Sequence, residues 1–177
     1  MKKAAMRASI SFRPLTRSDF PALQEWLSAP HVAAWWHDPL DLAGVEAKYG
    51  RRVDGAEPTH VFVIEQAGRP VGWIQWYLWS DYPEHALQLK AEAASAGIDL
   101  AIGELAMTGL GLGPVAIREF LRQVAFRSPR VSAVITDPEE GNRRSLRAFE
   151  KAGFTLANTV QLVGENFKRR VVRMDRL

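Results

Sequence analysis

The chain lacks cysteine altogether, although it is 177 residues long. This absence excludes a disulfide-stabilised scaffold, a metal site built from thiolates and a cysteine nucleophile. Long apolar runs are also missing, since no segment approaches the roughly 18 consecutive apolar residues of a membrane helix. The basic residues 1–7 are not followed by the apolar core of a signal peptide. We therefore expect a cytoplasmic protein without a membrane partner.

A strong excess of charge is missing as well. The 23 basic and 20 acidic residues leave a net charge of +3, which is too small to indicate a nucleic-acid partner. Two basic clusters, at residues 143–147 and 168–170, fit a phosphate-binding face and equally fit a solvated charged surface. We predict no bound metal, because the histidines lack the spacing of metal ligands. The four histidines are His31, His37, His60 and His85.

The chain does contain enough apolar residues, 47%, to bury one sizeable core, and we expect a single domain over residues 1–177. Strand and helix periodicities follow one another along it. The order predicts an α/β (α+β) fold in which helices flank a mixed, mostly antiparallel sheet. The expected strands are residues 10–15, 60–65, 71–77, the segment that contains Asp99, 131–136, 154–162 and 170–174. The expected helices are residues 18–28, 41–49 with Gly50 as the C-cap, 113–126, and 142–152 ended by Gly153.

The most informative segment joins a strand that carries a carboxylate to a glycine-rich loop that opens a helix. It reads Gly97-Ile98-Asp99 and then, after a short gap, Thr108-Gly109-Leu110-Gly111-Leu112-Gly113. Glycines let a backbone approach an anion closely, and the first N–H groups and the dipole of the helix attract it. The segment therefore predicts a phosphate-binding loop.

A second segment about thirty residues further on makes this interpretation more specific. It runs from Thr136-Asp137-Pro138 through Asn142-Arg143-Arg144-Ser145 to Phe149-Glu150-Lys151-Ala152-Gly153-Phe154. Together with the glycine loop it resembles the acetyl-CoA-dependent N-acetyltransferases of the GNAT superfamily. In that superfamily the loop binds the pyrophosphate of acetyl-CoA, and the second segment flanks the pantetheine.

The amino-terminal third narrows the resemblance. Residues 23–27, Leu-Gln-Glu-Trp-Leu, and residues 31–36, His-Val-Ala-Ala-Trp-Trp, are similar to the substrate-side helices of the aminoglycoside 6'-N-acetyltransferases. The Gly-Ile-Asp triplet precedes the glycine loop in that family at the spacing seen here. The resemblance implies acetyl transfer from acetyl-CoA to the 6'-amino group of an aminoglycoside, which would give antibiotic resistance. Residues 80–96 are the least similar stretch.

The resemblance also implies roles for particular residues. Asp99 matches the acidic residue that anchors the reacting amine and serves as its base. The strand is expected to continue through residues 104–107, and Glu104 on it is the second candidate base. Asp137 would bind another ammonium group of the substrate or, equally, form a turn with Pro138. Trp36 and Trp79 would stack on the sugar rings, whereas the other tryptophans fit core packing. The expected acetyl-CoA contacts are Leu105, Ala106, Met107, Gly109, Leu110, Gly111, Leu112, Gly113, Asn142, Arg144 and Phe149.

Three positions depart from the family pattern. Thr108 and Leu110 stand where the loop usually carries basic or amide side chains, so the backbone alone would hold the pyrophosphate. Phe149 replaces the tyrosine that is often assigned to protonating the departing thiolate, and phenylalanine has no proton to give. Because a thiol of pKa about 8.5 is a tolerable leaving group, activity does not require a replacement. Water, Ser145, Tyr77 and Tyr82 remain open as proton donors.

Two other functions stay open beside aminoglycoside acetylation. A related GNAT enzyme could acetylate a different amine, such as a siderophore precursor. A degenerate GNAT domain could bind acyl-CoA without catalysis, which the phenylalanine and the uncharged loop would explain. The sequence leaves the oligomeric state open between a monomer and a homodimer.

Overall fold

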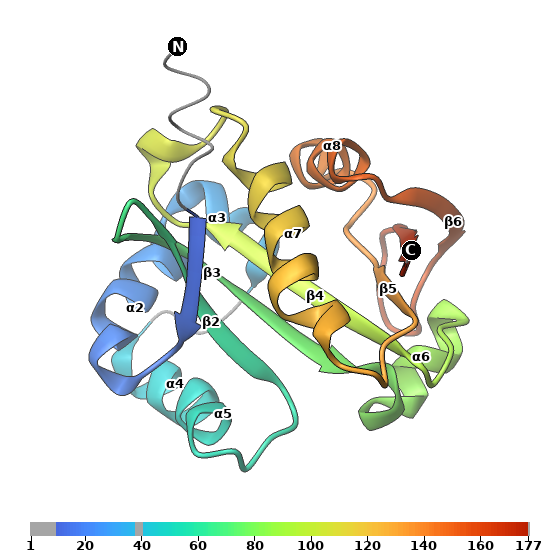
Figure 1. Cartoon of the computed structure of the whole chain (residues 1–177), viewed down its shortest axis with the longest axis horizontal. Helices are drawn as coiled ribbons and strands as arrows, with labels where there is room; N and C mark the ends of the chain where they lie inside the picture. Colours follow the sequence, from blue (N-terminus) through green and yellow to red (C-terminus); the bar gives the residue numbers. More distant parts are fainter. Residues whose placement is uncertain (1–9, 38–40, 177) are drawn as a thin grey trace. The chain divides into compact units, whose positions relative to one another are not determined.

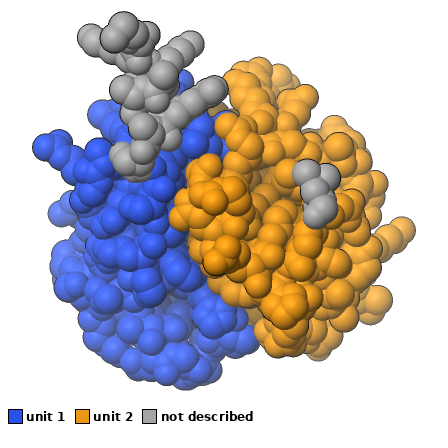
Figure 2. Space-filling model, viewed as in Figure 1, with its two compact units in different colours: residues 1–75, 100–116 blue, residues 76–99, 117–177 orange. Residues whose placement is uncertain are grey.

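The computed structural model describes residues 10–37 and 41–176. The basic amino-terminal residues 1–7 lie outside the described residues. Two compact units make up the chain (Figure 2). Unit 1 comprises residues 1–75 and 100–116, and unit 2 comprises residues 76–99 and 117–177. Our expectation of a single domain stays a prediction.

The strands form one sheet of seven with the order β1-β2-β3-β4-β5-β7-β6. The pairs β1·β2, β5·β7 and β6·β7 are antiparallel, whereas β4 and β5 are parallel. The mixed, mostly antiparallel sheet flanked by helices is therefore confirmed. The strands are β1 Ile10–Pro14, β2 His60–Gln66, β3 Arg69–Leu78, β4 Ser95–Ile102, β5 Ala133–Thr136, β6 Thr155–Val160 and β7 Arg169–Asp175.

The helices follow the expected order with one addition, since residues 83–89 had no helical prediction. They are α2 Phe20–Ser28, α3 Pro30–Trp36, α4 Leu42–Val45, α5 Arg51–Val53, α6 Pro83–Leu89, α7 Leu112–Gln123 and α8 Arg143–Ala152 (Figure 1). Within the described residues, no helix combines the length and the apolar character that crossing a membrane requires.

Unit 1 has its own apolar core around α2. Phe20, Leu23, Trp26 and Leu27 are all buried, as their helical spacing predicts. They pack with residues of β2, β3 and the following helices. The strands β2 and β3 are joined by a tight turn at Ala67 and Gly68, which both have positive φ, as the strongly twisted two-residue hairpin requires.

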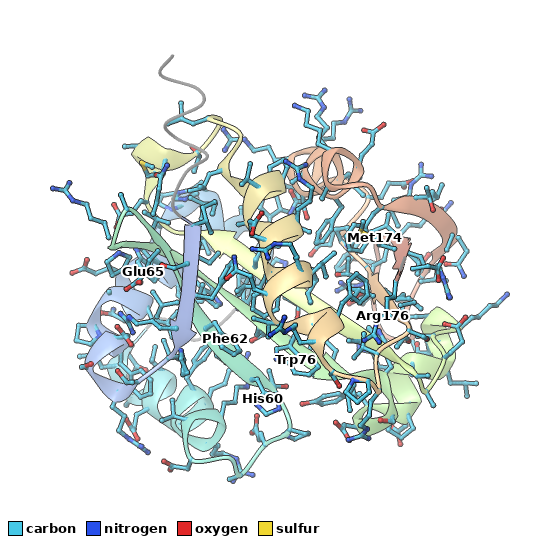
Figure 3. All side chains as sticks on the ribbon, in the orientation of Figure 1. His60, Phe62, Glu65, Trp76, Met174 and Arg176 are labelled. Carbon is cyan, nitrogen blue, oxygen red and sulfur yellow. The ribbon has the colours of Figure 1, made fainter. Side chains whose placement is uncertain are left out.

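The start of this helical region is held by an acidic side chain with several partners. The carboxylate of Asp19 accepts hydrogen bonds from both terminal nitrogens of Arg13, at 2.8 and 2.7 Å, and from the backbone N–H of Thr16 at 2.9 Å. Arg13 also donates a hydrogen bond to Glu65 at 2.9 Å. Glu65 lies on β2 and is labelled in Figure 3. The hydrogen bonds from Arg13, above all, hold the pKa of Asp19 below its ordinary value.

A carboxylate whose folded-state pKa is lowered stabilises the fold above its unfolded-state pKa, and this contribution is lost as the pH falls through the folded-state pKa. We therefore expect Asp19→Asn to lower the free energy of unfolding by about 2 kcal/mol at pH 7. The difference from the wild type should shrink below about pH 4. Urea unfolding at pH 7 and pH 3 measures it, and an equal loss at both values would contradict the charged role of Asp19.

The expected helix from Asp41 begins where predicted but ends later. Asp41 caps it, because its Oδ1 accepts the N–H of Gly44 at 2.7 Å. The prediction that Gly50 is the C-cap was wrong, since Gly50 has helical φ and ψ angles and the chain continues through a π-helical turn into α5. A Cβ on Gly50 would lie 2.7 Å from Glu46 Oε1. Glycine at position 50 therefore leaves room for the Glu46 side chain. Gly55, with φ +71°, follows the helix α5.

Unit 2 has a separate apolar core. Trp79, Ala86, Leu89, Ile135 and Val171 are buried in it, and Tyr77 and Tyr82 pack against them. The helix α8 ends where predicted, because Gly153 closes it at φ +110°. It begins one residue after the predicted start, with Asn142 as the N-cap whose Oδ1 accepts the N–H of Ser145. The core of unit 2 thus includes Ile135, near the carboxyl end of β5.

Candidate active site

The triplet on β4 brings Asp99 together with a tyrosine of β3. Successive strand residues point to opposite faces, so Gly97 and Asp99 share one face. A Cβ on Gly97 would lie 2.5 Å from Cζ and 2.8 Å from the hydroxyl oxygen of Tyr77. The negative charge of the Asp99 carboxylate and a hydrogen bond to it contribute to the raised pKa of Tyr77. The glycine of the triplet therefore makes room for the ring that reaches Asp99.

Ile98, between Gly97 and Asp99, helps to hold β4 in place. Ile98 is fully buried, and its carbonyl accepts a hydrogen bond from Thr136 Oγ1 at 2.8 Å. Thr136 ends β5 and directly precedes Asp137. Asp99 thus lies on β4, and Asp137 directly follows β5, the parallel neighbour of β4.

The negative charges of Asp99 and Asp137 both act on the phenol of Tyr77. Burial raises the pKa of Tyr77 well above its ordinary value, and the negative charges of Asp99 and Asp137 and the hydrogen bond to Asp99 raise it further. At neutral pH the phenol therefore keeps its proton and donates it to Asp99. A phenol of such high pKa is a poor acid for a thiolate, which disfavours Tyr77 among the proton donors that the sequence left open.

Asp137 lies inside unit 2 with two basic partners. Its side chain is 6% exposed, and its Oδ2 lies 3.2 Å from Nε2 of His85 and 3.5 Å from Nη1 of Arg169. Arg169 also donates a hydrogen bond to the backbone carbonyl of Asp137 at 3.1 Å. An arginine of the protein itself thus neutralises the carboxylate that the sequence suggested for a substrate ammonium.

The basic cluster at residues 168–170 has a structural role. Arg169 pairs with Glu165 at 2.6 Å and Arg170 with Glu140 at 2.8 Å. Burial lowers the pKa of Arg169, but the hydrogen bond to Glu165 and the charge of Asp137 outweigh it, so the pKa is raised overall. These contacts favour the charged-surface interpretation over a phosphate-binding face.

The segment after β4, in unit 1, leaves the sheet earlier than predicted. Gly103 N and Glu104 N both donate to the carbonyl of Val71, at 2.9 and 3.1 Å, and Leu105–Met107 then forms a 3-10 turn. The expectation that these residues continue the strand was wrong. The cause is a side chain from α2, since the Trp26 ring occupies the space of a Cβ on Gly103 and its Nε1 donates to Glu104 at 2.9 Å.

The glycine loop has the backbone that its sequence predicts. Gly109 and Gly111 have φ of +74° and +83°, the left-handed conformation from which anion-binding nests are made. Both are exposed, and α7 begins at the next residue, Leu112. Thr108 Oγ1 donates to the carbonyl of Leu105 at 2.8 Å, closing the 3-10 turn. Within unit 1, a glycine loop thus leads directly into a helix N-terminus.

The cofactor candidates of unit 2 lie on α8. Asn142 caps this helix, whereas Arg144 is exposed in its first turn together with Arg143. Phe149 is 3% exposed and packs edge-on against Phe154 at 5.0 Å. The ring of Phe149 is therefore part of the apolar packing of unit 2.

The two tryptophans chosen for sugar stacking differ in exposure. Trp36 is partly buried in unit 1 and meets Trp73 edge-on at 4.7 Å. Trp79 is 1% exposed, packs edge-on against Tyr77 and His85, and donates to the carbonyl of Ile135 at 3.1 Å. Trp79 is therefore a core residue in this structure, and Trp36 is the better candidate for an acceptor contact.

Sequence reasoning missed three residues of the site in unit 2. Tyr77 was considered only as a proton donor, His85 only as a scattered histidine, and Arg169 only as part of a basic cluster. The contact of Tyr77 with Asp99 depends on strand pairing, which a single sequence does not reveal. Among the described residues, no group of three or more histidine, aspartate or glutamate side chains is placed to hold a metal ion.

Known proteins resemble the chain along most of its length. Residues 16–162 match the family model described as an acetyltransferase (GNAT) domain. The aminoglycoside N(6')-acetyltransferases type 1 of Klebsiella pneumoniae and Serratia marcescens are 30% identical over 155 residues, which are 86% of this chain and 77% of theirs. A lysine N-acyltransferase, MbtK, of Mycobacterium tuberculosis is 24% identical over 136 residues, 77% of this chain and 64% of its own.

Solved structures agree with these relatives. The aminoglycoside acetyltransferase AAC(6')-Ib in complex with coenzyme A superposes with a TM-score of 0.80 at 28% identity, and 95% of each chain is covered. The complex of the same enzyme with coenzyme A and kanamycin gives a TM-score of 0.79 at 28% identity, with the same coverage. The chain therefore belongs to the GNAT acetyltransferases, within the family of the aminoglycoside 6'-N-acetyltransferases, and is an acyltransferase.

Proposed function

We propose that this enzyme transfers the acetyl group of acetyl-CoA to the 6'-amino group of an aminoglycoside, and so confers resistance. The observation that carries the proposal is the built setting of Asp99, in which Gly97 admits the ring of Tyr77 and the phenol holds the carboxylate. The similar aminoglycoside N(6')-acetyltransferases and the AAC(6')-Ib complexes with coenzyme A and kanamycin support it.

Acetyl-CoA is the acyl donor in this proposal. The N–H groups of the loop at residues 108–113 and of the first turn of α7 would hold its pyrophosphate through the positive helix end. Because no basic side chain stands in that loop, we expect backbone geometry to dominate the affinity. Arg144, exposed on α8, would add charge for the phosphates.

Asp99 would bind and deprotonate the acceptor amine. An aliphatic ammonium is protonated at neutral pH, so one proton must leave before the nitrogen lone pair can attack the thioester carbonyl carbon. Asp99 would anchor the ammonium and take up that proton, directly or through water. The carbon–sulfur bond then breaks, and the nitrogen gives up its second proton to water as the amide forms. Coenzyme A leaves as a thiolate that takes a proton from water.

The surroundings of Asp137 suggest a secondary role at most. A substrate ammonium at this carboxylate would compete with Arg169, which lies 3.5 Å away. We therefore propose that Asp99 carries most of the acceptor recognition and that Trp36 contributes an aromatic contact. We also propose that the enzyme works in the cytoplasm as a monomer or a homodimer, without nucleic acid or membrane.

A panel of acceptors tests the function against the two alternatives. Thiol release from acetyl-CoA should be fast with an aminoglycoside that carries a 6'-amine and at background level with lysine. Faster release with lysine or N6-hydroxylysine would shift the function toward the alternative that the lysine N-acyltransferase relative favours. Coenzyme A binding without thiol release for any amine would indicate a non-catalytic domain.

A further inference from the structure

We propose that Tyr77 is the positioning residue of Asp99, and that Gly97 is a glycine because the Tyr77 ring lies over it. This inference rests on the proposed function, in which Asp99 anchors the acceptor amine. It adds a task that neither the family resemblance nor the relatives assign to Tyr77, namely to fix the orientation of the Asp99 carboxylate.

The ring of Tyr77 is held by its neighbours in unit 2. It meets Trp79 edge-on at 5.1 Å with an interplanar angle of 87°, and Tyr82 at 5.1 Å with an angle of 74°. Trp79 is itself fixed by its hydrogen bond to Ile135. On β4, the absence of a Cβ at Gly97 provides the space that the ring and the hydroxyl occupy. The ring is therefore confined by Trp79, Tyr82 and the backbone at Gly97, on the face of β4 that also carries Asp99.

A hydrogen bond from Tyr77 is suited to hold the Asp99 carboxylate in one orientation. The torsion that turns a carboxylate is broad, so an aspartate at a strand gains a defined orientation only from its partners. A hydrogen bond from a neutral donor to a charged carboxylate is stronger than one between neutral groups. The carboxylate offers about four acceptor positions, so a bond from Tyr77 is compatible with a bond to an ammonium.

The electrostatic setting keeps Tyr77 in its donating form. The groups that act on the phenol are Asp99, Asp137 and Tyr82, and burial and the two carboxylates raise the pKa of Tyr77. Of these groups, Asp137 is itself paired with Arg169 and His85. The hydroxyl thus remains protonated across the pH range in which an acetyltransferase would be assayed.

The test is Tyr77→Phe, which keeps the ring and removes only the hydroxyl. We expect kcat/KM for the 6'-amino acceptor to fall about tenfold, as for the loss of one hydrogen bond to a charged group, while KM for acetyl-CoA stays unchanged. The acid limb of the pH profile should move to higher pH, because a carboxylate that loses a donor favours its protonated form. In an Asp99→Asn background the same change should have little further effect.

A matched control and an activity-free measurement make the test decisive. Tyr49→Phe removes a buried hydroxyl from unit 1 and should leave the pH profile in place. The 13C signal of the Asp99 carboxyl, titrated by NMR, should shift its midpoint upward in Tyr77→Phe. An unchanged pH profile, an unchanged NMR midpoint, or an equal loss in the Asp99→Asn background would each overturn the inference.

Failure of the proposed function can be distinguished from failure of the inference about Tyr77. If the wild-type enzyme acetylates no 6'-amine, the function is wrong, but the NMR titration still reports whether Tyr77 holds Asp99. Gly97→Ala adds a second route, since its Cβ would displace the Tyr77 ring. The folded variant should show the same upward shift of the NMR midpoint, and an unshifted midpoint would count against the inference.

Discussion

Replacing Asp99 by alanine should lower kcat/KM for a 6'-amino aminoglycoside by about 10³-fold, while acetyl-CoA binding and the fold are preserved. A general base contributes about 10² to 10⁴ to a rate, and this residue would also be lost as the anchor of the ammonium. The fold should survive because Asp99 is only partly buried. Steady-state kinetics, coenzyme A binding and thermal unfolding of the variant measure the three quantities.

Two further variants separate the possible causes of such a loss. Asp99→Asn keeps an acceptor for the Tyr77 hydroxyl but removes the negative charge. The fall in kcat/KM in this variant therefore measures what the charge and the basicity of Asp99 contribute. Glu104→Gln is the matched control, because glutamine can still accept the hydrogen bond from Trp26 Nε1, and it should stay within a few-fold of the wild type. A larger loss in Glu104→Gln than in Asp99→Asn would make Glu104 the base.

Gly111→Val should weaken coenzyme A binding by about tenfold to a hundredfold. Gly111 has φ +83° with nothing within 4 Å of a Cβ, so the added Cβ itself meets no steric clash. A valine cannot adopt this backbone conformation without strain. Such strain costs about 1–3 kcal/mol, and about 1.4 kcal/mol is a factor of ten in affinity. The loop would relax to another conformation and lose its aligned N–H groups. Isothermal titration with coenzyme A measures the change.

A glycine elsewhere in unit 1 provides the control. Gly55 has φ +71°, again with nothing within 4 Å of a Cβ, but it follows α5 rather than the loop. Gly55→Val should therefore carry a similar cost in stability and leave coenzyme A affinity unchanged. Equal affinities in Gly111→Val and the wild type would remove the glycine loop from the cofactor site.

Features with a local cause could be predicted from the sequence. The apolar face of α2, the cap of α8 by Asn142 and its end at Gly153 all follow from residues a few positions apart, and the structure has each of them. The glycine loop was predictable for the same reason, since positive φ at Gly109 and Gly111 is a property of those residues.

Features that depend on distant residues were not predictable in this way. Gly50 resembled a C-cap, but it admits Glu46 across a π-helical turn. The strand that carries Asp99 was predicted to continue through residues 104–107, but it ends at Ile102. The distant Trp26 packs against Gly103 and donates to Glu104 just after this end. Trp79 and Phe149, chosen from the sequence as ligand contacts, are both buried in unit 2, and their roles as ligand contacts stay predictions. The partners Tyr77 and Arg169 became visible only with the pairing of their strands.

The most direct measurement of the central claim compares two aminoglycosides that differ only at the 6' position, one with an amine and one with a hydroxyl. Thiol release from acetyl-CoA is followed with the purified wild-type protein. The account predicts release with the 6'-amine alone and a product that carries one acetyl group on that nitrogen. Equal release with both compounds, or release with neither despite coenzyme A binding, would contradict it.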